Sequence, residues 1–97
     1  ITDNFPRILP AGHAGEIDLQ SWKVPPLFTY LQQTGNVAES EMLRTFNMGL
    51  GFLFVVPRGQ AEKAMETVAL TGTTAYRVGE IIAGEPQVHY KGTLNHG

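Results

Sequence analysis

The residues best suited to chemistry lie in the stretch from Glu41 to Gly51, where Thr45 and Asn47 sit beside Gly49. Two closely spaced glycines allow positive φ angles and a close approach of the backbone to another surface. The Asn47 amide adds a hydrogen-bond donor and an acceptor. This corner could therefore present polar groups and backbone amides to a ligand. The structural alternative is that Asn47 or Gly49 is the left-handed cap of a helix, and the chain only turns there.

The three histidines, His13, His89 and His96, show no metal-binding spacing. A zinc site needs three or four convergent ligands, and these residues fall in a predicted loop, strand and tail. No nucleophile elbow, phosphate-binding loop or dinucleotide fingerprint occurs, and the fragment Gly49-Leu50-Gly51 precedes a predicted strand instead of following one. The motifs alone thus indicate neither a metal centre nor catalytic residues.

Other side chains each allow a chemical and a structural interpretation. Glu16 and Asp18 could form an acid and base pair, but alternate positions on a strand are typical of a solvated face. Arg7 could hold a phosphate through two hydrogen bonds or form a surface ion pair. Trp22 and Phe28 could stack on a base, yet their apolar neighbours favour the core.

The elements that would position these residues follow from the hydrophobic spacing. We predict a short helical segment from residues 2–4 towards 9, and helices over 25–35, about 38–46 and 61–72, with Gly35 ending the second of these four. The predicted strands are 15–19, 52–56, 74–83 and 87–91, and the tail 92–97 is expected to fray. The run Phe52 to Val56 has the composition of a strand buried on both faces.

The order of these elements predicts the fold class. From Phe52 onward it is strand, helix, strand, strand, with two helices before it. This order indicates an α/β (α+β) fold, in which helices cover at least one face of a mixed sheet.

Composition limits the possible partners. The 97 residues suffice for one small domain, and 7 basic against 9 acidic residues give a net charge of −2 without a basic stripe. Neither nucleic acid nor an anionic membrane is indicated as a partner. The absence of cysteine excludes a disulfide framework and a thiolate metal site. No signal peptide or membrane span is predicted, so we expect a soluble protein, and the start at Ile1 looks like the interior of a longer chain.

The strings themselves resemble a known family. They are Asp3–Pro10, Ile17-Asp18 with Ser21-Trp22, Pro25–Phe28, Leu31–Val37 and, above all, Glu41–Gly51. They are similar, in order and spacing from Asp3 to about Val88, to the C-terminal end of phosphoribosylformylglycinamidine cyclo-ligases, also called aminoimidazole ribonucleotide synthetases.

This resemblance implies part of an ATP-dependent ring closure in de novo purine biosynthesis, which converts formylglycinamidine ribonucleotide to aminoimidazole ribonucleotide. In the family, ATP activates the amide oxygen, an amidine nitrogen attacks the activated carbon, and phosphate leaves. Phosphorylation is needed because an amide oxygen is a poor leaving group, while Mg²⁺ and cationic groups offset the charge. The resemblance also implies a cytoplasmic homodimer for the intact enzyme.

The chain departs from the family pattern in two places. It lacks the N-terminal domain that carries the ATP-binding loop and most acidic metal ligands, and it starts after a Thr-Gly-Gly-Gly turn that holds a phosphate in the family. We therefore expect residues 1–97 to be a single partial C-terminal domain that is inactive alone and binds neither ATP nor Mg²⁺ by itself. By analogy, substrate-binding residues beside the missing turn and along the cleft between the domains are Asn4, Arg7, Thr45, Phe46, Asn47 and Gly49.

Two alternatives remain open at this stage. The first is another ATP-using member of the superfamily, such as formylglycinamidine ribonucleotide synthetase, thiamine-monophosphate kinase or selenophosphate synthetase. The string Arg44–Gly51 argues against these enzymes. The second is a non-catalytic α/β binding module, which would fold alone, whereas a fragment would expose an apolar surface.

Overall fold

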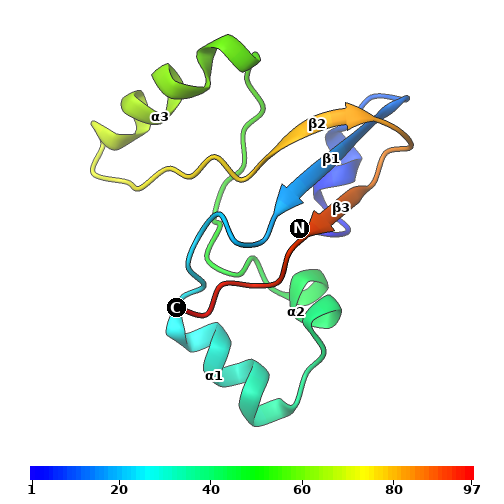
Figure 1. Ribbon diagram of the computed structural model, residues 1–97, viewed down its shortest axis with the longest axis vertical. Helices are drawn as coiled ribbons and strands as arrows, with labels where there is room; N and C mark the ends of the chain where they lie inside the picture. Colours follow the sequence, from blue (N-terminus) through cyan, green and yellow to red (C-terminus); the bar gives the residue numbers. More distant parts are fainter.

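The computed structural model describes all residues 1–97 and shows three helices around a small mixed sheet (Figure 1). The strands are β1 (His13–Asp18), β2 (Gly79–Ala83) and β3 (Val88–Lys91). The helices are α1 (Pro26–Gly35), α2 (Glu39–Thr45) and α3 (Ala61–Ala69), with short 3-10 turns η1 (Phe5–Ile8) and η2 (Arg58–Gln60). The predicted α+β class with a mixed sheet and helices is confirmed.

Strand β1 is the centre of the sheet, in the order β2-β1-β3. It pairs antiparallel with β2, with Ile17 opposite Gly79, and parallel with β3, with Gly15 opposite Val88. Ile17 is buried whereas Glu16 on the opposite face is partly exposed, because successive side chains of a strand point to opposite faces. The predicted alternation of this strand is confirmed.

The first two helices begin and end for local reasons. Pro26 opens α1, where its fixed φ suits a helix and its missing N–H is not needed. Asn36 ends α1 in the left-handed conformation with φ 51°, one residue after the glycine that was predicted to end it, and its N–H bonds to the Gln32 carbonyl. In α2, acidic residues occupy the first turn and Arg44 the last, so both charges favour the helix dipole.

The core lies at one end of the sheet, below β1 in Figure 1. It joins β1, the loop after it, α2 and the C-terminal tail through eight buried side chains: Ile17, Leu19, Trp22, Val24, Met42, Leu43, Met48 and Leu94. The interpretation of Trp22 as a core residue is confirmed. The prediction of a frayed tail is wrong, because Leu94 is buried and the Val24 N–H donates to the Asn95 carbonyl at 2.8 Å.

The predicted strand 52–56 is wrong for this chain. The segment runs as drawn-out backbone from the core towards α3, but it pairs with no strand, and Phe52 and Phe54 are exposed (Figure 1). The predicted strand 74–83 is shortened, because only β2 at its end is paired. Both differences have one cause: no strand within residues 1–97 hydrogen-bonds to the unpaired parts.

Replacing Gly79 by alanine should disrupt the β1–β2 ladder. A Cβ at this position would collide with the Glu16 carbonyl oxygen, whereas a Cβ at Gly59 would meet nothing within 4 Å. We expect Gly79→Ala to lower the free energy of unfolding by about 1–3 kcal/mol and the control Gly59→Ala to change it by less than about 0.5 kcal/mol. Urea denaturation followed by Trp22 fluorescence measures both, and equal midpoints would contradict the register.

Candidate functional site

The glycine corner after α2 is a tight turn and not a helix cap. Helix α2 ends at Thr45 and Phe46 is extended, so the interpretation of Asn47 or Gly49 as a left-handed cap is wrong. The Leu50 N–H donates to the Asn47 carbonyl at 3.0 Å across a four-residue turn. Its two central residues both have positive φ, 54° at Met48 and 98° at Gly49, as in a type I′ turn. The Asn47 Oδ1 accepts the Gly49 N–H at 2.8 Å, which reinforces this geometry.

Two contacts with the loop after β1 hold this turn in place. The Trp22 Nε1–H donates to the Met48 carbonyl at 3.0 Å, and the Met48 side chain is fully buried beside it. A Cβ on Gly49 would lie 2.6 Å from Pro25 Cδ, so only glycine fits there. A buried carbonyl needs a partner, and the indole supplies it. The turn is therefore fixed by the core although its tip faces solvent.

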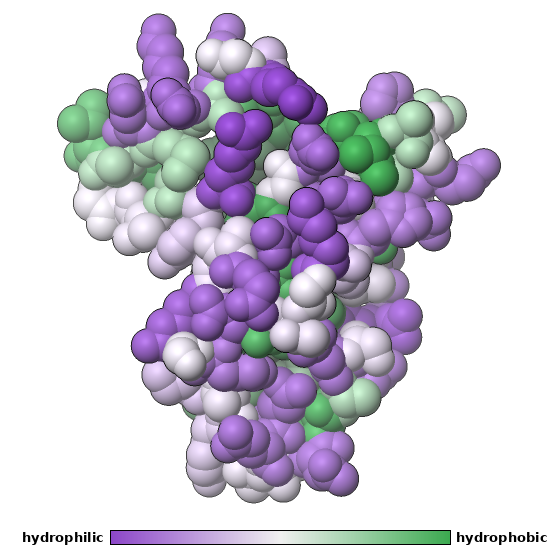
Figure 2. Space-filling view, viewed as in Figure 1, coloured by the Kyte–Doolittle hydropathy of each residue, from purple (hydrophilic) through white to green (hydrophobic).

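A cavity of about 650 Å³ begins at this turn. Residues 49–56 form one wall, and the side of α3 that carries Ala64, Met65 and Val68 forms another. Residues 73–81 and the middle of β1 complete the lining, together with Phe5. Most lining residues are apolar, with Glu16, Arg58, Arg77 and Glu80 as the charged exceptions. In the space-filling view, apolar surface appears in the upper half of the molecule, which α3 and the sheet share (Figure 2).

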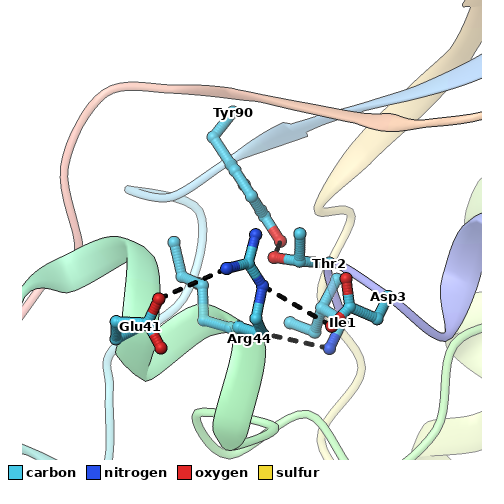
Figure 3. A network of polar contacts seen from close by, with 7 residues as sticks. Ile1, Thr2, Asp3, Glu41, Arg44 and Tyr90 are labelled. Carbon is cyan, nitrogen blue, oxygen red and sulfur yellow. Dashed lines mark hydrogen bonds and ion pairs between the residues drawn. The ribbon is translucent and has the colours of Figure 1, made fainter.

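A polar network fixes the N-terminal segment beside α2 (Figure 3). Arg44 lies 3.5 Å from Asp3 and 3.2 Å from Glu41, and both carboxylates are exposed. The Ile1 backbone nitrogen donates to the Leu43 carbonyl at 3.4 Å. Exposed ion pairs of this kind contribute about 0–1 kcal/mol each, so they position the segment more than they stabilise it.

Tyr90 closes this network from β3. Its hydroxyl lies 2.7 Å from the Thr2 Oγ1 (Figure 3). Burial raises the pKa of Tyr90 above its usual value near 10, and the hydrogen bond to Thr2 acts in the opposite direction.

Comparison with known proteins identifies the family of this chain. The model of the family described as "AIR synthase related protein, C-terminal domain" matches residues 1–91. The chain belongs to this family. It is also 46% identical, over 84 residues, to the chloroplastic phosphoribosylformylglycinamidine cyclo-ligase of Arabidopsis thaliana. That alignment covers 87% of this chain and 22% of the relative, so the chain spans about a fifth of the relative's length.

The structure places the six predicted site residues in three groups. Gly49 lines the cavity. Thr45 and Asn47 are exposed and do not line the cavity, whereas Phe46 is half-buried with its ring centroid 5.7 Å from that of Phe28. Asn4 and Arg7 are exposed at η1 and lie outside the cavity lining, although their neighbour Phe5 belongs to it. Substrate contact by these residues stays a prediction.

Sequence reasoning missed the part that residues 52–56 and 73–78 play in the cavity. The signal was present, because the apolar run Phe52 to Val56 was recognised as a strand to be buried. It was assigned to the interior of the domain, while the structure leaves it on the wall of an open cavity. Glu16 and Asp18 lie on the partly exposed side of β1, where Glu16 is 3.4 Å from Lys91. Their assignment to a solvated face is confirmed.

The chain's own residues do not fit the ATP and Mg²⁺ that the AIR synthase related family implies. No group of three His, Asp or Glu side chains lies close enough together to hold a metal ion. The cavity offers only Arg58 and Arg77 to a triphosphate, and Arg58 is engaged with Glu80 at 2.9 Å. None of the helices has both the length and the apolar character required to cross a membrane.

Replacing Gly49 by alanine should destabilise the turn. The change combines an unfavourable positive φ with the contact to Pro25, so we expect a loss of about 2–4 kcal/mol in the free energy of unfolding. Gly51→Ala is the matched control, because a Cβ there meets nothing within 4 Å. Denaturation of both variants, followed by Trp22 emission, tests this expectation, and equal stability of the two would refute the turn geometry.

The raised pKa of Tyr90 predicts a loss of stability at alkaline pH. Above about pH 10 the unfolded chain releases this proton before the folded chain does, so the free energy of unfolding falls as pH rises, and it is unaffected by this group at lower pH. Tyr90→Phe should decline less steeply than the wild type above pH 10. Tyr76→Phe, which removes the hydroxyl of an exposed tyrosine, is the matched control. Urea denaturation at stepped pH, monitored by circular dichroism, separates the two outcomes.

Proposed function

We propose that this chain is the C-terminal domain of a phosphoribosylformylglycinamidine cyclo-ligase. The observation that carries the proposal is the 46% identity to the Arabidopsis thaliana cyclo-ligase over 87% of the chain. The longer protein would close the imidazole ring of aminoimidazole ribonucleotide from formylglycinamidine ribonucleotide. ATP, with Mg²⁺, would supply the activation of the amide oxygen, held by a part of the enzyme outside residues 1–97.

The contribution of this domain would be one rigid wall of the substrate cleft. The Asn47 side chain uses its oxygen within the turn, and its NH₂ group has no partner in the structure and can donate to a substrate. The buried Trp22 contact fixes the direction of this donor. Preorganised donors cost little reorganisation when substrate binds, which suits a positioning role.

Arg7 and Asn4 would bind the phosphate of the ribonucleotide from η1. Arg7 is exposed and takes part in none of the ion pairs of the structure, so its guanidinium is available. A guanidinium matches phosphate oxygens through paired hydrogen bonds. Thr45, Phe46 and Gly49 would shape the adjoining wall of the cleft.

Oligomeric state and compartment are also part of the proposal. The intact enzyme is proposed to be a homodimer in the cytoplasm. The Arabidopsis thaliana relative is chloroplastic by its name, and that location is a property of the relative alone. No observation favours the superfamily alternatives or the non-catalytic module as strongly as the 46% sequence identity favours the cyclo-ligase.

Arg7→Ala in the longer protein should lower kcat/KM for formylglycinamidine ribonucleotide by at least about tenfold. The reason is the loss of a charge-assisted hydrogen bond worth about 1.5–3 kcal/mol, with no ion pair in the domain to disturb. Lys63→Ala, on the exposed side of α3 and also outside the ion pairs, should leave kcat/KM unchanged. Ring closure is followed as ATP-dependent formation of aminoimidazole ribonucleotide.

Two further results of this assay would count against the proposal. Wild-type turnover by Arg7→Ala would remove the phosphate role. Turnover by the isolated polypeptide 1–97 would show that no second part is needed, whereas we expect none.

A further inference from the structure

Two stretches of the chain carry backbone groups without partners. Residues 51–56 neither donate nor accept a backbone hydrogen bond, and neither do residues 73–77. Figure 1 shows them as extended backbone before and after α3. Both border the same cavity. Backbone N–H and C=O groups in folded proteins are nearly all paired when they are covered by apolar side chains. The two stretches therefore have the bonding capacity of sheet strands that lack a neighbour.

The side chains along residues 51–56 are also arranged as in a strand without a neighbour. Phe52 is 78% exposed and its ring centroid is 5.3 Å from that of Phe54, so the two rings contact each other instead of a core. Residues i and i+2 share a face only in an extended strand. Opposite them, the apolar side of α3 is only half-buried, and no residue of this helix is fully buried.

The whole molecule exposes more surface and makes fewer backbone hydrogen bonds than a compact domain of its length. A compact monomer of 10.6 kDa should expose about 5,500 Å², and this chain exposes 6485 Å². The excess of about 1,000 Å² is close to the share that one partner contributes to a stable interface. The radius of gyration is 14.0 Å, where about 12.5 Å is typical of this length. There are 45 backbone–backbone hydrogen bonds, where about 65 are typical.

We propose that residues 51–56 and 73–77 are strands of a larger sheet, completed by a β-strand from outside residues 1–97 of the same, longer polypeptide. The order strand, α3, strand is that of a βαβ unit, in which the helix covers the face of the strands. The incoming strand would lie in the cavity, bond to the free backbone groups and place apolar side chains against Phe54 and Met65.

The same polypeptide is the source favoured by two observations. The matched residues form only 22% of the relative, so proteins of this kind contain further chain. Phe5 lines the cavity, so a segment preceding Ile1 would reach it through a short connection. A second copy of this chain is a poorer source, because its own unpaired strands are the same two, each still in need of a neighbour. The inference stands on packing and holds whatever reaction the protein catalyses.

Hydrogen exchange in the longer protein tests the proposal directly. We expect the amides of residues 51–56 and 73–77 to exchange at least roughly a hundredfold more slowly than in an unstructured peptide, at every protein concentration. Exchange at the unstructured rate would overturn the proposal. Protection that disappears on dilution to the monomer would also overturn it, since the partner would then be a second copy. A source gene that encodes no further strand-forming segment would do the same.

A pair of substitutions provides an independent test. Leu70 is 87% exposed and lies outside the cavity lining, whereas Phe52 is 78% exposed and lines the cavity. In the longer protein, Phe52→Lys should lower Tm by several degrees, because a charge would be buried against the added strand, while Leu70→Lys should leave Tm within about one degree. Equal Tm values for the two variants would show that Phe52 is solvent-exposed there too, and would overturn the proposal.

Discussion

The contact between the Trp22 indole and the Met48 carbonyl is the interaction on which the half of this molecule that contains the core depends. It joins two segments 26 residues apart, the loop that leaves β1 and the turn that follows α2. Met48 holds a positive φ without being glycine, which costs of order 1 kcal/mol or more. The burial of its side chain and the satisfaction of its carbonyl offset this cost. The direction of the turn is therefore set by the core and not by the turn sequence alone.

The part of the chain between this turn and β2 has no such anchor. From Gly49 to Val78 no residue is fully buried, although the stretch contains the strongest helical periodicity of the sequence, that of α3. Periodicity decides that a segment is helical and which side is apolar, but it does not supply the surface that covers this side. In this structure α3 is held mainly by its own chain neighbours, so its apolar side remains available for packing.

The sequence predicted elements well where the cause was local. Pro26 at the start of α1, the charges at the two ends of α2 and the alternation along β1 act within a few residues, and each produced the expected element. The prediction failed where the cause was remote. The run 52–56 needs a neighbouring strand, and the tail is held by the burial of Leu94 and by the pairing of Asn95 with the loop at Lys23 and Val24.

The candidate site shows the same limit. The corner at Asn47 and Gly49 was recognised from composition, but its nature as a turn depends on Pro25 and Trp22, which are more than 20 residues away. No local pattern could reveal that contact. Arg7 and Asn4 were selected by resemblance alone, and the structure shows them exposed at η1, outside the cavity lining.

The anchored turn and the uncovered cavity meet at Gly49 and Leu50, which belong to both. Gly49 is packed against Pro25. Two residues later, at Gly51, the stretch without backbone hydrogen bonds begins. A strand that paired with this run would therefore extend order from the core, through the turn, to the cavity wall. Completing the sheet would also enclose the cavity beside Asn47, so the packing of the longer protein and the formation of a ligand wall would be one event. This coupling would place the corner at Asn47 and Gly49 where a backbone fixed by the core borders the surface that the rest of the protein must cover.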